Sequence, residues 1–174
     1  MDVRPPVSER AKRRRSRLLF ASVVLAVAGS VAAAASGATT GSPLNLQGKN
    51  VLTGKPVSLA ADAGKPVVVN LWSSSCGACF ADARALASFE HAHPAARVLG
   101  VDVADSAAGA RSLSKRAGWR HPSIADPSGR IAAQLKMTTL PTTLFLNAKH
   151  EIVERINGQT TAAGFAAGYR KASA

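Results

Sequence analysis

Residues 67–79 read Val67-Val68-Val69-Asn70-Leu71-Trp72-Ser73-Ser74-Ser75-Cys76-Gly77-Ala78-Cys79. The apolar, β-branched start of this stretch predicts a strand that is buried on both faces. The alanine-rich residues after Cys79 have helical character. The two cysteines of the chain, Cys76 and Cys79, therefore lie at a predicted strand-to-helix turn.

The Cys-x-x-Cys spacing at this turn favours redox chemistry. Free backbone N–H groups and the positive end of the dipole at a helix N-terminus stabilise a thiolate and lower the pKa of a cysteine placed there. The second thiol, one turn into the helix, can reach the first. We therefore expect Cys76 to be the exposed nucleophile that attacks a partner's disulfide, and Cys79 to be the shielded thiol that resolves the mixed disulfide.

Two other interpretations of the cysteine pair remain open. A zinc site needs three or four ligands, and the histidines do not repeat the spacing of a zinc ribbon: His91, His93, His121 and His150. A purely structural disulfide would close a loop too short to restrict the unfolded chain by much. A redox pair fits the sequence better than either, and on that interpretation we expect no metal and no organic cofactor.

The N-terminus has the layout of a secretory signal or a signal anchor. Residues 1–17 hold seven basic and two acidic residues, and residues 18–36 are uncharged and mostly apolar. As a helix, residues 18–36 would just cross a hydrocarbon core about 30 Å thick, with the basic flank in the cytoplasm. We favour this single-pass anchor, although Ala33-Ala34-Ala35 also fits a cleavage point that would release a secreted or periplasmic protein. Either way, the cysteines lie outside the cytoplasm, where disulfides persist.

The formal net charge of +12 raises nucleic acid as an alternative partner for the basic arm. An apolar segment of membrane-spanning length follows that arm directly. Anchoring in the membrane explains the charge more economically, and we expect no nucleic-acid binding.

One α/β domain is expected after a linker. Residues 37–43 are small and polar, as in linkers, and residues 44–174 follow as the folded domain. Apolar alternation predicts an N-terminal hairpin over 44–46 and 57–59. Further strands are predicted over 67–72, 98–103, 121–124, 142–146 and 151–156, and helices over 80–92, 106–117, 130–135 and 161–170. This order predicts a mixed central sheet with helices on both faces.

Several motifs occur together in the chain: Gly64-Lys65-Pro66 before the strand at 67–72, Cys76-x-x-Cys79, Gly100-Val101-Asp102-Val103, Asp126-Pro127-Ser128-Gly129-Arg130 and Leu140-Pro141-Thr142-Thr143. This succession resembles the TlpA/ResA-like branch of the thioredoxin superfamily, over roughly residues 44–172. Members are anchored or exported thiol-disulfide oxidoreductases, so the resemblance implies a thioredoxin-like fold and the same activity.

The resemblance implies roles for individual residues. Cys76 corresponds to the attacking cysteine and Cys79 to the resolving one. Pro141 corresponds to a proline that relatives hold in the cis form opposite the disulfide, where the backbone of Leu140 would pair with an extended substrate segment. Without the resemblance, Pro141 would simply be a turn proline before a strand. Asp82 corresponds to a glutamate near the thiols and is a candidate for exchanging a proton with Cys79. As a first-turn acid it could instead serve only the helix dipole.

Other positions support the resemblance or depart from it. Asn70 stands where thioredoxins proper carry a buried acid, and Trp72 lies within the matching motif. Ser75 replaces the Trp or Tyr that relatives often carry before the first cysteine. The aromatic cover over the thiol is therefore missing, and the sequence does not identify the surface that contacts a partner. Gly77-Ala78 has neither the proline of reductant thioredoxins nor the histidine of strong oxidants. We therefore expect a reduction potential of roughly −180 to −270 mV.

These features predict an extracytoplasmic thiol-disulfide oxidoreductase that acts on cysteines of exported proteins. Reduction of apocytochrome c for haem attachment and formation or correction of disulfides both fit, and each requires a membrane thiol electron donor or acceptor. The alternative is a copper-handling module that binds Cu(I) with the same cysteines, although copper-binding relatives usually have a wider cysteine spacing. A peroxidase of this fold would place its reactive cysteine in a loop with proline and threonine, which the sequence lacks.

Overall fold

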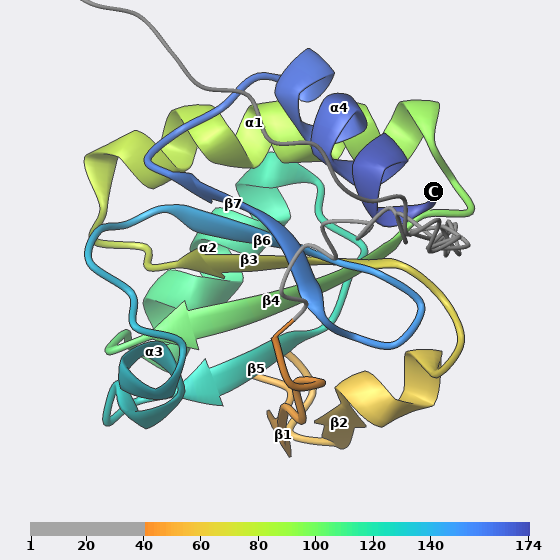
Figure 1. Ribbon diagram of the computed structural model, residues 1–174. Helices are drawn as coiled ribbons and strands as arrows, with labels where there is room; N and C mark the ends of the chain where they lie inside the picture. Colours follow the sequence, from red (N-terminus) through yellow and green to blue (C-terminus); the bar gives the residue numbers. More distant parts are fainter. Residues whose placement is uncertain (1–40) are drawn as a thin grey trace, which may run out of the picture. The chain divides into compact units, whose positions relative to one another are not determined.

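The computed structural model describes residues 41–174 (Figure 1). The basic residues 1–17, the anchor or signal segment predicted over 18–36 and most of the linker predicted over 37–43 lie outside the described residues. Between residues 41 and 174, no helix is both long enough and apolar enough to cross a membrane.

A mixed five-stranded sheet forms the centre of the fold, with the strand order β5-β4-β3-β6-β7. Its strands are β3 (Val67–Trp72), β4 (Arg97–Val103), β5 (Ser123–Asp126), β6 (Thr142–Leu146) and β7 (Ile152–Asn157). β4 runs parallel to both β3 and β5, whereas β6 runs antiparallel to both β3 and β7. Every residue of β3 is buried, which is why this central strand has a continuous apolar sequence rather than an alternating one.

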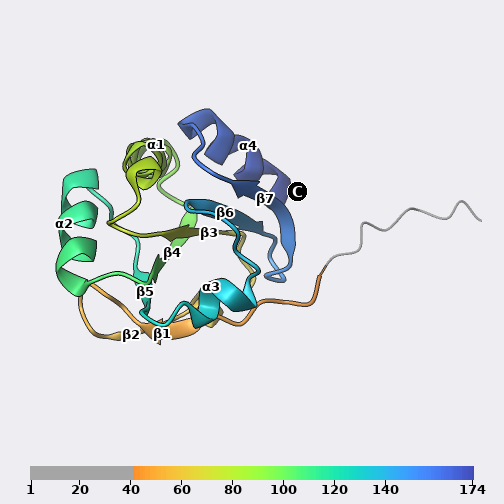
Figure 2. The same ribbon diagram turned by 90° about the vertical axis from the view of Figure 1, so that its left-hand side faces the viewer.

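Helices cover both faces of the sheet, as predicted (Figure 2). One face carries α1 (Gly77–Ala92), α2 (Ala107–Ala117) and α4 (Ala162–Ala172). The other face carries the short helix α3 (Arg130–Gln134), the 3-10 helix η1 (Leu59–Asp62) and a two-stranded hairpin of β1 (Gln47–Lys49) and β2 (Pro56–Ser58).

Alternate residues of β3 supply the two halves of the core. Val68 packs with Leu86 and Phe89 of α1 and with the rings of Phe145 and Phe165. The intervening residues pack on the opposite side with η1, α3 and β6, in a cluster that includes Val67, Val69, Leu71, Leu59, Ile131 and Leu144. The period of two along a strand thus places the cysteine-bearing helix α1 on one face and the hairpin on the other.

Two predicted strands are shifted along the chain. The first hairpin strand is Gln47–Lys49 and shares no residue with the predicted range 44–46, because Leu46 is turned into the core and the Leu44 N–H donates to the His150 carbonyl at 2.9 Å. β5 begins at Ser123 rather than at residue 121. Pro122 has no N–H to give to a sheet ladder, and it contributes only its carbonyl, which accepts from Gly100 at 2.9 Å.

The candidate site lies at the carboxyl ends of the neighbouring strands β3 and β4. β3 and β4 are parallel neighbours, so the segments that follow their carboxyl ends lie side by side and lead into the N-termini of α1 and α2. Ser106 caps α2 by accepting from the Gly109 N–H, and Gly118 ends the helix in the left-handed conformation. The loop before Cys76 therefore faces the loop before α2.

Candidate active site

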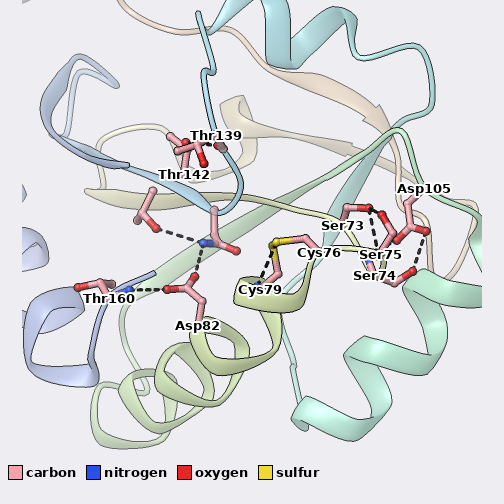
Figure 3. The surroundings of a disulfide bond; sticks show 12 residues. Ser73, Ser74, Ser75, Cys76, Cys79, Asp82, Asp105, Thr139, Thr142 and Thr160 are labelled. Atoms are coloured by element: carbon pink, nitrogen blue, oxygen red, sulfur yellow. Dashed lines mark hydrogen bonds between the residues drawn. A yellow bond between two sulfur atoms is a disulfide. The ribbon is translucent and has the colours of Figure 1, made fainter. Parts of the chain in front are cut away.

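Cys76 and Cys79 form a disulfide at the N-terminus of α1 (Figure 3). Cys76 is the N-cap of the helix, and its Sγ accepts a hydrogen bond from the Cys79 N–H at 3.1 Å. Cys76 is half-buried, whereas Cys79 is only 1% exposed. An incoming group can therefore reach Cys76 while Cys79 is shielded, which is the asymmetry that an attacking and a resolving cysteine require.

Asp82 lies one helical turn after Cys79 and is 1% exposed. Its two carboxylate oxygens accept hydrogen bonds from the Asn70 side-chain amide at 3.0 Å and from the Thr160 backbone N–H at 2.9 Å (Figure 3). Burial raises the pKa of Asp82, and the hydrogen bonds from Thr160 and Asn70 offset part of that rise. Asp82 can therefore keep a proton at a higher pH than an exposed aspartate can.

Asn70 connects this acid to the central sheet. The Asn70 amide also donates to the Thr143 hydroxyl at 3.1 Å, and the two residues are direct neighbours between β3 and β6. Because Asn70 is itself 1% exposed, its amide is held by these contacts rather than by water. Asn70 is thus a buried donor that fixes the orientation of the Asp82 carboxyl.

The loop before β6 packs beside the disulfide. The Leu140–Pro141 peptide bond is cis, and the Thr142 hydroxyl donates across it to the Thr139 carbonyl at 2.7 Å (Figure 3). The Pro141 carbonyl accepts from the Gly158 N–H at 2.8 Å. Leu140 contacts the cluster that contains both cysteines, so the structure brings the predicted docking loop to the redox pair.

The remaining motif residues divide into buried and exposed ones. Trp72 is fully buried, and its ring meets that of Trp119 edge-on, with ring centroids 4.8 Å apart. Trp72 therefore packs under the site and does not face a partner. Ser75, Gly77 and Ala78 are exposed around Cys76, so no aromatic side chain at position 75 covers the disulfide.

The sequence did not indicate one part of the site, the contact between Ser74 and Asp105. The Asp105 carboxylate accepts from the Ser74 N–H at 2.5 Å and from the Ser74 hydroxyl at 2.7 Å (Figure 3). It also accepts from the Ser106 N–H at 2.6 Å. An Asp-Ser pair before a helix indicates a cap, but no local signal shows contact with a serine 31 residues earlier. The contact of Thr160 with Asp82 was missed for a similar reason, since it uses a backbone N–H that nearly any residue supplies.

Residues 41–174 contain no group of three or more His, Cys, Asp or Glu side chains that could hold a metal ion. His121, the most buried histidine there, is 3.0 Å from Glu90. The zinc interpretation of the cysteine pair thus lacks a ligand set in this part of the chain.

The fold and the disulfide at the start of α1 define a thiol-disulfide oxidoreductase of the thioredoxin fold, the class that the sequence predicted. Residues 42–155 match the AhpC/TSA family, and the chain belongs to this family. A search of curated proteins gave no significant match.

Solved structures with a similar fold include several bacterial proteins named for thiol-disulfide chemistry. A DsbF homologue from Corynebacterium diphtheriae is 28% identical with a TM-score of 0.69, over 76% of this chain and 87% of that one. A secreted thiol-disulfide isomerase from Corynebacterium glutamicum is 23% identical with a TM-score of 0.67, over 73% and 82%. StoA from Bacillus subtilis is 23% identical with a TM-score of 0.62, over 72% and 96%. These neighbours agree with the TlpA/ResA-like resemblance.

Proposed function

We propose that this protein exchanges disulfides with cysteines of exported proteins outside the cytoplasm. The observation that carries the proposal is the asymmetry of the redox pair: a half-buried Cys76 caps α1, and a fully buried Cys79 lies one turn below it. A partner's sulfur can reach only the first cysteine, so the order of the two steps follows from the geometry.

In the reducing direction, the Cys76 thiolate attacks one sulfur of the substrate disulfide. A mixed disulfide forms, and the other substrate sulfur leaves as a thiolate that takes up a proton. The Cys79 thiolate then attacks the Cys76 sulfur, so the second substrate thiolate leaves and the Cys76–Cys79 disulfide forms. The substrate gains two electrons and the protein loses two. The same steps in reverse donate the disulfide.

Asp82 is the proposed proton acceptor for Cys79. Cys79 is buried and must lose its proton before it can attack, and Asp82 is the acid one turn further along the same helix. The raised pKa of the buried Asp82 carboxyl makes it a better base than an exposed aspartate would be. The opposite transfer would return the proton when the disulfide is reduced.

The Leu140–Pro141 loop is the proposed docking segment. Leu140 is half-buried against the cysteine cluster, and an extended substrate strand beside it would bring its own cysteine to Cys76. Backbone pairing of this kind recognises an extended segment with little regard to its side chains. This fits a protein that serves more than one exported substrate.

The N-terminal sequence and one relative support the location outside the cytoplasm. Residues 1–36 have the signature of a signal or anchor, and the relative from Corynebacterium glutamicum is described as secreted. To turn over, the protein must exchange electrons with a membrane thiol donor or acceptor. Candidate substrates are apocytochrome c and other exported proteins with cysteine pairs.

A trapping experiment tests this proposal. The full-length Cys79→Ser variant, reduced, is mixed with a disulfide-bonded peptide that carries Cys-x-x-Cys-His, the haem-attachment pattern, or with a disulfide peptide of unrelated sequence. We expect a stable mixed disulfide through Cys76, visible by mass spectrometry and absent in Cys76→Ser. A preference for the first peptide supports a cytochrome role, and equal trapping supports general disulfide exchange. Trapping through Cys79 in Cys76→Ser at the same rate contradicts the proposed order of steps.

A further inference from the structure

The segment before Cys76 is a tight turn whose central residue contacts the loop before α2. The Cys76 N–H donates to the Ser73 carbonyl at 3.2 Å, which closes the turn. Ser74, inside the turn, gives both its N–H and its hydroxyl to the two oxygens of Asp105 (Figure 3). Because Asp105 belongs to the loop before α2, the position of Cys76 depends on a residue outside the Cys-x-x-Cys motif.

Gly109 also packs closely against Ser74. Gly109, in the first turn of α2, has so little free space that an added Cβ would overlap the Ser74 hydroxyl oxygen. The same Cβ would lie 3.0 Å from an oxygen of Asp105. Ser74 and Asp105 therefore both pack closely against Gly109.

The backbone that presents Asp105 is in an uncommon conformation. Ala104 has a φ of 48°, in the left-handed region that favours glycine. Its N–H donates to the Asp126 carbonyl at 3.0 Å, so the conformation is fixed by the neighbouring strand β5. A non-glycine residue stays in this conformation only where the surrounding contacts hold it.

A second acid, Asp102, is buried near the end of β4, three residues before Asp105. Asp102 is 2% exposed, and β3 and β5 place Trp72 and Ala125 opposite it, so its charged neighbour is Asp105. Burial, and then the charge and hydrogen bond of Asp105, raise the pKa of Asp102 to about 8. At neutral pH, Asp102 therefore carries a proton that it donates to Asp105.

Asp105 keeps the negative charge of this pair. Partial burial would raise the pKa of Asp105, but its hydrogen bonds from Ser74, Ser106 and Asp102 outweigh that effect and hold the pKa below the usual value. The pair thus contains one proton and one charge at neutral pH, and the charge lies on the oxygens that hold Ser74.

We propose that Asp105 is a positioning residue for Cys76 that fixes the Ser73–Cys76 turn through Ser74. The inference rests on the proposed function, because it takes Cys76 as the attacking sulfur. Attack requires the Cys76 sulfur to approach the substrate disulfide in line, and a loosened turn loses that orientation.

The test measures how fast reduced full-length protein reacts with a disulfide peptide. We expect Asp105→Ala to lower the second-order rate constant by about tenfold to a hundredfold. Asp105→Asn keeps one oxygen for Ser74 and should recover part of the rate, which a role through charge alone would not allow. Asp62→Ala is the matched control, because Asp62 is an acid that pairs with Arg97 at the start of β4, at the opposite end of the sheet from the cysteines. It should react at the wild-type rate.

Two further variants keep the inference testable if Asp105→Ala does not fold. Ser74→Ala removes only the hydroxyl contact, and Gly109→Ala places a Cβ against the Ser74 hydroxyl; both should slow the reaction by about threefold or more.

The outcomes separate the two claims. If wild-type protein exchanges with the peptide but the Asp105, Ser74 and Gly109 variants all match its rate, the positioning role is overturned and the proposed function stands. If wild-type protein does not exchange at all, the proposed function fails first.

Discussion

The side-chain amide of Asn70 donates a hydrogen bond to the Asp82 carboxylate at 3.0 Å. Asp82 also accepts from the Thr160 N–H, so the central strand, the cysteine-bearing helix and the segment before α4 meet at one buried acid. Because an asparagine does not titrate, any charge at this point belongs to Asp82. The proton that Cys79 must lose and the acid that could take it therefore belong to one helix, α1.

Replacing Asp82 with asparagine should slow the second step of exchange. Without a base beside it, Cys79 loses its proton more slowly, and we expect resolution of the mixed disulfide to fall about tenfold or more at neutral pH. Attack by Cys76 should change little. Rapid acid quenching followed by mass spectrometry would show the mixed disulfide accumulating. Asp82→Glu should retain most of the rate, and an unchanged resolution step in Asp82→Asn would contradict the role of Asp82.

Replacing Asn70 with alanine should weaken the fold and raise the pKa of Asp82 further. The change leaves one buried carboxylate oxygen without its donor, which we expect to cost about 1 to 3 kcal/mol in the free energy of unfolding. Thr143→Val is the matched control, because it removes the other partner of the Asn70 amide and leaves the bond to Asp82 intact. Urea denaturation of both variants gives the comparison. An equal effect of the two changes on the pH dependence of resolution would argue against a specific link to Asp82.

Asp102 should make the protein less stable as the pH rises. Its folded pKa of about 8 lies above the ordinary value of 3.8, so between these values the folded state binds a proton that the unfolded state has lost. Stability from this group is complete below about pH 4, falls by at most about 1.4 kcal/mol per pH unit, and is lost above about pH 8. Asp102→Asn removes this contribution. Denaturation at pH 5, 6.5 and 8 should show the wild type losing stability relative to the variant, and parallel curves would contradict the assignment.

Gly168 should tolerate no larger residue. A Cβ at this position of α4 would overlap the Phe145 ring in the core, so Gly168→Ala should destabilise the protein by about 1 to 3 kcal/mol despite the better helix propensity of alanine. At Gly77, the first residue of α1, an added Cβ has no neighbour within 4 Å. Gly77→Ala should therefore change stability by less than about 1 kcal/mol. Thermal unfolding compares the two, and equal stability would mean that α4 can shift away from β6.

The sequence was most informative where burial and chain reversal leave a local pattern. The continuous apolar run of β3, the Gly118 that ends α2 and the proline before β6 each have one dominant physical cause, so these elements lie where expected. The boundaries near Leu46 and Pro122 shifted because each depends on a tertiary contact. No residue pattern near Leu46 shows that it turns into the core.

The same distinction separates the predicted part of the site from the missed part. Cys76, Cys79 and Asp82 lie on one helix, so their proximity follows from the spacing. Asp105 reaches Ser74 across two parallel strands, and Thr160 reaches Asp82 with a backbone group. Contacts of this kind depend on sheet register, which a single sequence does not encode locally.

The reduction potential of the Cys76–Cys79 pair is the most direct test of the central claim. Full-length protein would be equilibrated in glutathione or dithiothreitol buffers, and free thiols counted by alkylation and mass spectrometry. We predict one reversible two-electron transition at about −180 to −270 mV, lost in Cys76→Ser and in Cys79→Ser. A transition near −120 mV would contradict the expected potential and indicate a disulfide donor. The absence of any reversible transition would contradict the oxidoreductase account itself.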